Sequence, residues 1–76
     1  MTADDVLEMW TVYDHPRDMP DCFVARLFLV KAGAMEVTGI FRAAPTLDEV
    51  RAMLPLGLYR LPRSENDEPQ IVEVWL

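Results

Sequence analysis

The sequence predicts a small α+β domain, in which about five strands form an antiparallel sheet and one helix packs on one face. Two observations lead to this prediction. Several short apolar segments alternate with polar residues, as strands do, and only one segment has helical spacing. The predicted order is therefore β-β-β-α-β-β, within a chain of 76 residues that forms one domain.

The composition is that of a folded protein with one core. Hydrophobic residues make up 51% of the chain and charged residues 26%, which is too apolar for intrinsic disorder. We expect an acidic N-terminal leader at residues 1–8, followed by the single α+β domain at residues 9–76. A chain of this length leaves no room for a separate cofactor domain, and we expect no cofactor.

The first two strands are predicted at residues 9–13 and 22–31. Trp10 and Val12 share one face of the first strand. The second strand is apolar on both faces, which is typical of an internal strand. Arg26 lies within it and must either find an acidic partner or reach solvent.

A turn at residues 32–34 predicts a hairpin, with residues 35–43 as the returning strand. Gly39 interrupts this strand and indicates a bulge or a close backbone approach. Three apolar side chains are expected to point inward: Met35, Val37 and Phe41. The polar ones point outward, together with one apolar exception: Glu36, Thr38, Arg42 and Ile40.

The helix is predicted at residues 46–54. Thr46 and Glu49 have the spacing of a capping box, in which the hydroxyl accepts from a first-turn amide. An apolar stripe at helical spacing follows and is widened by Met53: Leu47, Val50 and Leu54. Pro55 and Gly57 then end the helix.

Two further strands are predicted at residues 58–61 and 70–76, separated by a polar loop at residues 62–69. Because a single helix covers only part of one sheet face, the other face is left with exposed apolar residues. The candidates for that face are Phe28, Ile40 and Trp75.

The charge argues against nucleic acid or an anionic membrane as a direct partner. The net charge is −6, and the seven basic residues are scattered along the chain. The first residues show no basic stretch followed by an apolar run, since Asp4, Asp5 and Glu8 lie there. Together with the single cysteine, this predicts a cytoplasmic protein. Six Arg against one Lys indicate a GC-rich genome of bacterial or phage origin, so we expect the cell to be a bacterial host cell.

The chain offers little for catalysis or metal binding. His15 and Cys22 are the single histidine and cysteine, and a dyad would need an orienting third group that no residue supplies. We therefore expect no catalytic residue and a protein that is not an enzyme. The loop residues with metal-ligand side chains lack the spacing of a calcium or zinc site, and no metal is expected: Asp14, His15, Asp18 and Asp21.

Acidic residues are the remaining candidates for a function. The first choice for a partner contact is the loop cluster of Glu65, Asp67 and Glu68. The second choice is the loop cluster of Asp14, Asp18 and Asp21. Acidic residues grouped on one face would steer a protein with a basic surface, although the same residues also keep a small protein in solution.

Two segments resemble small bacterial and prophage proteins without a known activity. They are the opening at residues 9–26, which reads MWTVYDHPRDMPDCFVAR, and the ending at residues 71–76, which reads IVEVWL. In size and charge the chain also loosely resembles phage anti-CRISPR proteins, several of which occupy basic nucleic-acid grooves. That resemblance implies an inhibitor which binds a protein.

The sequence thus predicts a small acidic interaction protein of phage or prophage type. It would block a basic nucleic-acid-binding surface, for example on a CRISPR effector complex, by steric and electrostatic occupancy. The alternative is an accessory or adaptor subunit, or a homodimer, that uses the exposed apolar sheet face.

Overall fold

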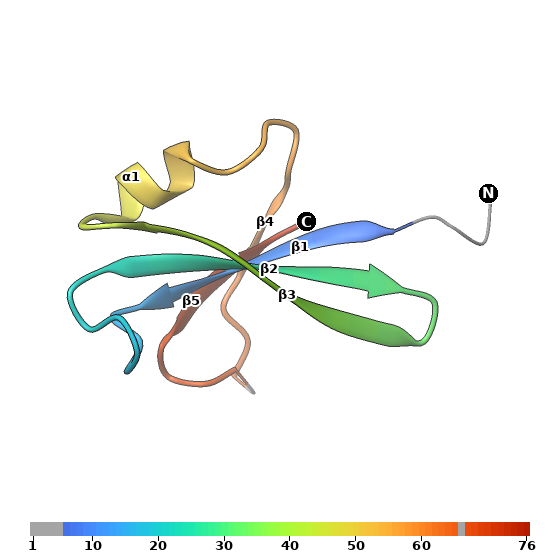
Figure 1. Ribbon diagram of the computed structural model, residues 1–76, viewed down its shortest axis with the longest axis horizontal. Coiled ribbons are helices and arrows are strands. Elements are labelled where there is room, and N and C mark those ends of the chain that lie inside the picture. The colour runs from blue at the N-terminus through green and yellow to red at the C-terminus, as the bar shows by residue number, and fades with distance from the viewer. Residues whose placement is uncertain (1–5, 66) are drawn as a thin grey trace.

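The computed structural model describes residues 6–65 and 67–76 and contains an antiparallel sheet with one short helix (Figure 1). The elements in chain order are β1 (Leu7–Asp14), β2 (Phe23–Lys31), β3 (Ala34–Ala44), α1 (Leu47–Ala52), β4 (Arg60–Pro62) and β5 (Ile71–Trp75). The five strands lie in the order β3-β2-β1-β5-β4, so the predicted fold class is confirmed. Within the described residues, no helix has the length and apolar run needed to cross a membrane.

Strand β1 begins earlier than predicted. Leu7 pairs with Val30 and Glu8 pairs with Leu29, so these two residues belong to the sheet and not to a leader. The reason is the length of β2, which runs to Lys31 and offers ladder partners beyond Met9. Of the other leader residues, Val6 is exposed and precedes β1, and residues 1–5 lie outside the described residues.

Strand β3 carries the predicted bulge at Gly39. The ladder passes from Arg26–Phe41 to Phe28–Val37, so the segment 38–40 lies opposite Leu27 alone. The Thr38 hydroxyl donates to the Leu27 carbonyl at 2.8 Å and accepts from the Ile40 amide at 3.0 Å. Gly39 has a φ of 79°, a left-handed conformation that glycine adopts at little cost.

The helix α1 is capped as predicted but is shorter. The Thr46 hydroxyl accepts a hydrogen bond from the Glu49 amide at 3.2 Å. Val50 and Leu54 are buried, whereas Met53 is exposed and does not widen the apolar stripe. The helix ends at Ala52 with Met53 as its C-cap, so the helical spacing that placed Met53 in the stripe no longer applies.

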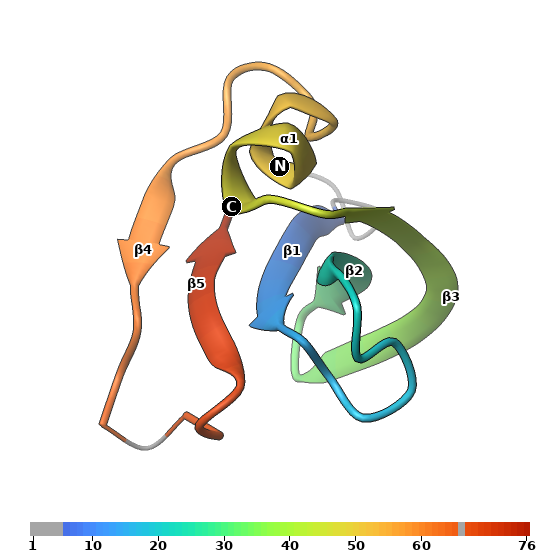
Figure 2. The same cartoon turned by 90° about the vertical axis from the view of Figure 1, so that its left-hand side faces the viewer.

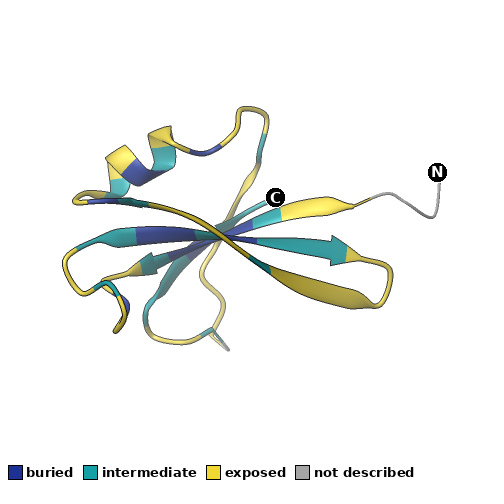
Figure 3. Cartoon of the chain, in the orientation of Figure 1, coloured by how far each residue is buried: buried dark blue, intermediate teal, exposed yellow. Residues whose placement is uncertain are grey.

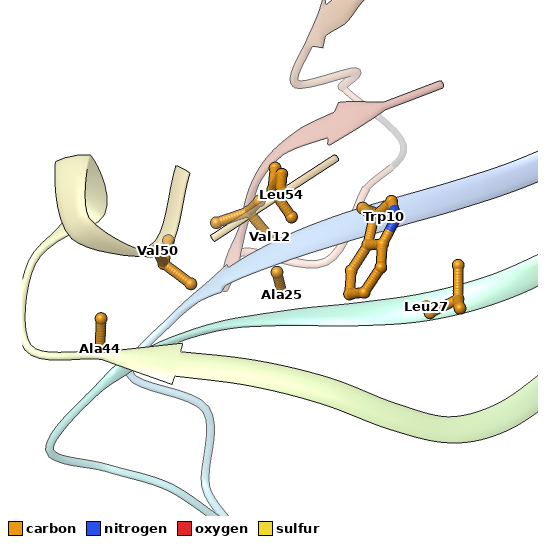
Figure 4. Close-up of a cluster of buried hydrophobic side chains, with 7 residues drawn as sticks. All are labelled: Trp10, Val12, Ala25, Leu27, Ala44, Val50 and Leu54. Carbon is orange, nitrogen blue, oxygen red and sulfur yellow. The ribbon is translucent and has the colours of Figure 1, made fainter. Parts of the chain in front are cut away.

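The core lies between α1 and one face of the sheet (Figure 4). Its buried members come from β1, β2, the end of β3 and the helix region: Trp10, Val12, Ala25, Leu27, Ala44, Val50 and Leu54. Trp75 packs against this cluster because the register pairs it with Trp10. The prediction that Trp75 lies on the uncovered face is therefore wrong.

The inward orientation predicted for β3 is also wrong. Met35 is 57% exposed, Val37 78% and Phe41 46%. Alternation correctly grouped these side chains on one face, but α1 packs on the opposite face and near the other end of β3 (Figure 3). Ile40 is exposed, as expected.

The last hairpin pairs β4 with β5 at the edge of the sheet. β4 lies two residues later than the predicted start, although Tyr59 and Leu76 continue the ladder with backbone hydrogen bonds of 2.8 and 3.0 Å. Pro62 ends β4, where an edge strand tolerates a residue without an amide hydrogen.

Candidate binding site at the loop end of the sheet

The two acidic loops, 15–22 and 63–70, meet at one end of the sheet. β1 runs into the first loop and β5 starts after the second, and these two strands are antiparallel neighbours. The Asp14 amide donates to the Gln70 carbonyl at 2.7 Å, which joins the loops at their bases. In Figures 1 and 2 both loops lie below the sheet, whereas α1 lies above it.

The first loop has a defined backbone. The His15 amide donates to the Cys22 carbonyl at 3.0 Å and closes the loop. Within it, the Met19 amide donates to the Pro16 carbonyl at 3.0 Å, and Pro16 itself is buried. His15 has a φ of 50°, so the chain turns sharply as it leaves β1.

An open pocket of about 600 Å³ lies between the two loops. Its walls combine apolar rings with polar and charged side chains from β1, β2 and both loops: Tyr13, Pro16, Arg17, Asp18, Arg26, Glu68, Pro69 and Gln70. This volume falls within the range of small-molecule and side-chain binding pockets.

Two lining residues of the pocket form an ion pair. The guanidinium of Arg26 donates to the carboxylate of Asp18, so this arginine finds the acidic partner expected for it. This hydrogen bond lowers the pKa of Asp18 below its ordinary value. The guanidinium also lies 5.6 Å from the ring centroid of Tyr13, in cation–π contact.

Tyr13 is a half-buried residue of the pocket wall. Burial raises the pKa of its phenol, because the phenolate would lose hydration, and the carboxylates of Glu68 and Asp18 act in the same direction. The phenol therefore stays neutral at physiological pH. It offers the pocket a hydroxyl donor and an aromatic face.

Glu68 and Arg17 line the pocket with opposite charges. Among the described residues, neither side chain has an ion-pair partner, in contrast to Asp18 and Arg26. The two carboxylates and two guanidiniums balance the charge within the pocket. Negative charge is in excess only in the surrounding loops.

The six carboxylates predicted for partner contact thus occupy different positions. The structure places Asp18 and Glu68 on the same pocket, from the two clusters. Asp67 accepts from the Ser64 amide at 2.8 Å and shapes its own loop, and Asp14 pairs with His15. The remaining two, Asp21 and Glu65, are exposed on the same loops.

The single histidine and cysteine lie at the base of the first loop. Their backbones are hydrogen bonded, but the His15 ring contacts Phe23 edge-on, with 5.0 Å between ring centroids, and its Nδ1 pairs with Asp14. The thiol of Cys22 is half-buried. Asp14 thus orients the imidazole, a role that was assigned to no residue from the sequence, but within the described residues the ring makes no hydrogen bond to the Cys22 thiol.

A buried carboxylate, Glu73, was missed by the sequence reasoning. It is only 1% exposed, on the helix-covered face of β5. Arg51 of α1 donates two hydrogen bonds to its carboxylate, from Nε to Oε2 at 2.8 Å and from Nη2 to Oε1 at 2.5 Å. The Trp75 indole donates to Oε2 at 2.6 Å, and Arg60 Nη1 lies 3.8 Å from Oε1.

This cluster ties the helix to the sheet. Burial alone would raise the pKa of Glu73, but the hydrogen bonds from Arg51 outweigh burial and lower it, so the carboxylate stays ionised. A fork of two parallel donors is specific to arginine, and it links α1, which packs on β2 and β3, to β5. A glutamate at the centre of the apolar segment IVEVW was the available signal in the sequence.

Comparisons with protein-family models, with curated proteins and with solved structures found no match.

Proposed function

We propose that this protein is a non-enzymatic binding module whose loop end docks on a cationic surface of another protein. The observation that carries the proposal is the convergence of loops 15–22 and 63–70 around one pocket. It supports grouping the acidic residues of both loops into one contact surface. A basic nucleic-acid-binding surface, such as that of a CRISPR effector complex, is the class of target that suits an acidic protein of this size.

Long-range attraction would bring the two proteins together. A net charge of −6 on 76 residues gives a negative potential that raises the association rate with a cationic partner. The exposed carboxylates of Asp21 and Glu65 add to this potential at the loop end. Attraction of this kind weakens as salt screens it.

Short-range contacts would then select the docked orientation. Glu68 is an exposed carboxylate at the pocket rim and would pair with an arginine or lysine of the partner. The Tyr13 ring already contacts Arg26, and its hydroxyl would offer the partner a hydrogen-bond donor beside Glu68. The guanidinium of Arg17 would donate to a carboxylate of the partner, next to the arginine or lysine that pairs with Glu68. The pocket therefore favours a partner surface of mixed charge with an excess of basic residues.

The test is a charge-reversal comparison. The loop-end variant Glu65→Lys/Glu68→Lys and the control Glu8→Lys/Glu36→Lys each change the net charge from −6 to −2. The control residues flank Leu29 at the opposite end of the same strands. Tagged proteins are used to capture partners from a bacterial lysate at low and high salt, and the captured proteins are identified by mass spectrometry.

We expect a nucleic-acid-binding protein to be captured at low salt by the wild type and by the control, and to be lost with the loop-end variant. Equal capture by the loop-end variant would remove the basis of the proposal. A partner retained at high salt would instead favour the alternative, an adaptor that docks through exposed apolar residues of the sheet.

A further inference from the structure

Two rows of side chains form an uncharged apolar surface at the hairpin end of the sheet. The register aligns Leu7, Val30 and Met35 in one row across β1, β2 and β3. It aligns Met9, Phe28 and Val37 in the next row on the same face. We call these six residues the hairpin face, and we propose that it packs against the hairpin face of a second copy of this chain to form a symmetric dimer.

Nothing in the described part of the chain covers the hairpin face. Helix α1 packs on the opposite side of the sheet, near the end where β3 finishes (Figure 1). The loops 15–22 and 63–70 lie at the other end of the same strands, around Tyr13 and Arg26. Figure 3 shows exposed β1 and β3 on either side of half-buried β2 in this region.

The size of the surface fits a small dimer interface. Together with Phe41, the next side chain on this face of β3, the hairpin face exposes apolar area on the order of 500 Å², at the upper end for a monomer. A stable interface buries about 800 Å² per partner, with a polar rim around an apolar centre. The rest of the interface would come from main-chain and polar atoms around the hairpin face.

The small core is the reason to expect a second copy as the partner. Among the described residues only eight hydrophobic side chains are buried, and two of them are alanines. Chains of this length commonly gain stability from disulfides or from self-association. A chain with one cysteine cannot form an internal disulfide. Self-association needs no other protein, because every cell that makes this chain contains further copies of it.

The hairpin face is also compatible with itself. It carries no charge, so two copies related by a two-fold axis bring apolar rows against apolar rows without burying an ion. Two sheets packed in this way lie about 10 Å apart, a spacing that side chains such as Phe28 and Met35 fill. The proposal does not depend on the function of the loop end, which lies outside this surface.

The test measures the mass of the protein in solution by light scattering and sedimentation between about 1 and 300 µM. The wild type should be a dimer at the upper concentrations. Val37→Glu places a charge at a side chain that is 78% exposed, so it should weaken the dimer at least tenfold and leave the fold intact by circular dichroism. The matched control is Leu56→Glu, at an apolar residue that is 99% exposed in the loop before β4 and should remain dimeric.

A second variant guards against an effect of Val37→Glu on folding. Met35→Lys lies in the neighbouring row and should also give a folded monomer. A wild type that is monomeric at 300 µM, or that forms a larger assembly, would overturn the proposal. So would a dimer that survives both hairpin-face variants. A monomeric wild type would leave the loop-end proposal standing, because that proposal is decided by its own charge-reversal experiment.

Discussion

The same three strands, β1, β2 and β3, behave differently at their two ends. Near α1 their inner face is packed, and Val12 and Ala25 are fully buried beneath Val50. At the hairpin end the other face carries side chains of similar apolar character, yet Met35 and Val37 are mostly exposed. The difference teaches that strand pattern alone does not make a core, because a face is buried only where another element covers it.

Charged groups show the same contrast between the two faces. Glu73 and Asp18 each pair with an arginine, but Glu73 is enclosed beneath α1 and Asp18 is exposed at the pocket. A buried carboxylate depends strongly on its partner, since removing that partner leaves an uncompensated charge. The exposed pair is screened by water and contributes little to stability.

The largest expected effect comes from breaking the buried pair. Arg51→Met should lower the free energy of unfolding by about 3 kcal/mol, because Glu73 then retains only Trp75 and the more distant Arg60. Urea denaturation measures this loss. The control Arg63→Met, whose exposed side chain donates to the Asp67 carbonyl at 3.4 Å, should change stability by less than about 0.5 kcal/mol. Equal losses in the two variants would refute the structural role of Glu73.

The next effect compares the same residue type at the covered and uncovered ends. Val50→Ala removes buried methyl groups and should cost about 2 kcal/mol at every protein concentration. Val37→Ala should cost less than about 0.5 kcal/mol in dilute solution, because the side chain is exposed in the isolated chain. Its cost should grow with concentration as the proposed dimer forms. A constant small cost for Val37→Ala would argue against the second copy.

A smaller effect should appear on acidification. Hydrogen bonds from Arg51 lower the pKa of Glu73 in the folded protein, so its ionised form stabilises the fold fully above the ordinary glutamate pKa of about 4.3. This contribution is lost as the pH falls from there through the folded-state pKa. The stability difference between the wild type and Glu73→Gln should therefore shrink between pH 6 and pH 3. A difference that is independent of pH would mean that the carboxylate charge is not what binds Arg51.

The features that the sequence predicted well are local ones. Thr46 and Glu49 are three residues apart, and Gly39 acts on its own strand, so their roles follow from short-range geometry. The pairing of Arg51 with Glu73 spans 22 residues and depends on where α1 settles. The convergence of the two acidic loops was equally hidden, because it requires β5 to lie beside β1.

The smallest expected effect tests the bulge that separates the two ends of β3. A Cβ atom at Gly39 would meet nothing within 4 Å, so Gly39→Ala adds no steric clash and its cost comes from the left-handed φ of 79°. We expect a loss of about 1 kcal/mol, measured by urea denaturation. Gly39→Asn should cost less, because asparagine tolerates this conformation better than alanine. If both variants were as stable as the wild type, the strand would be able to straighten. The bulge held by Thr38 would then not be what fixes the register of β3 against β2 on either side of Leu27.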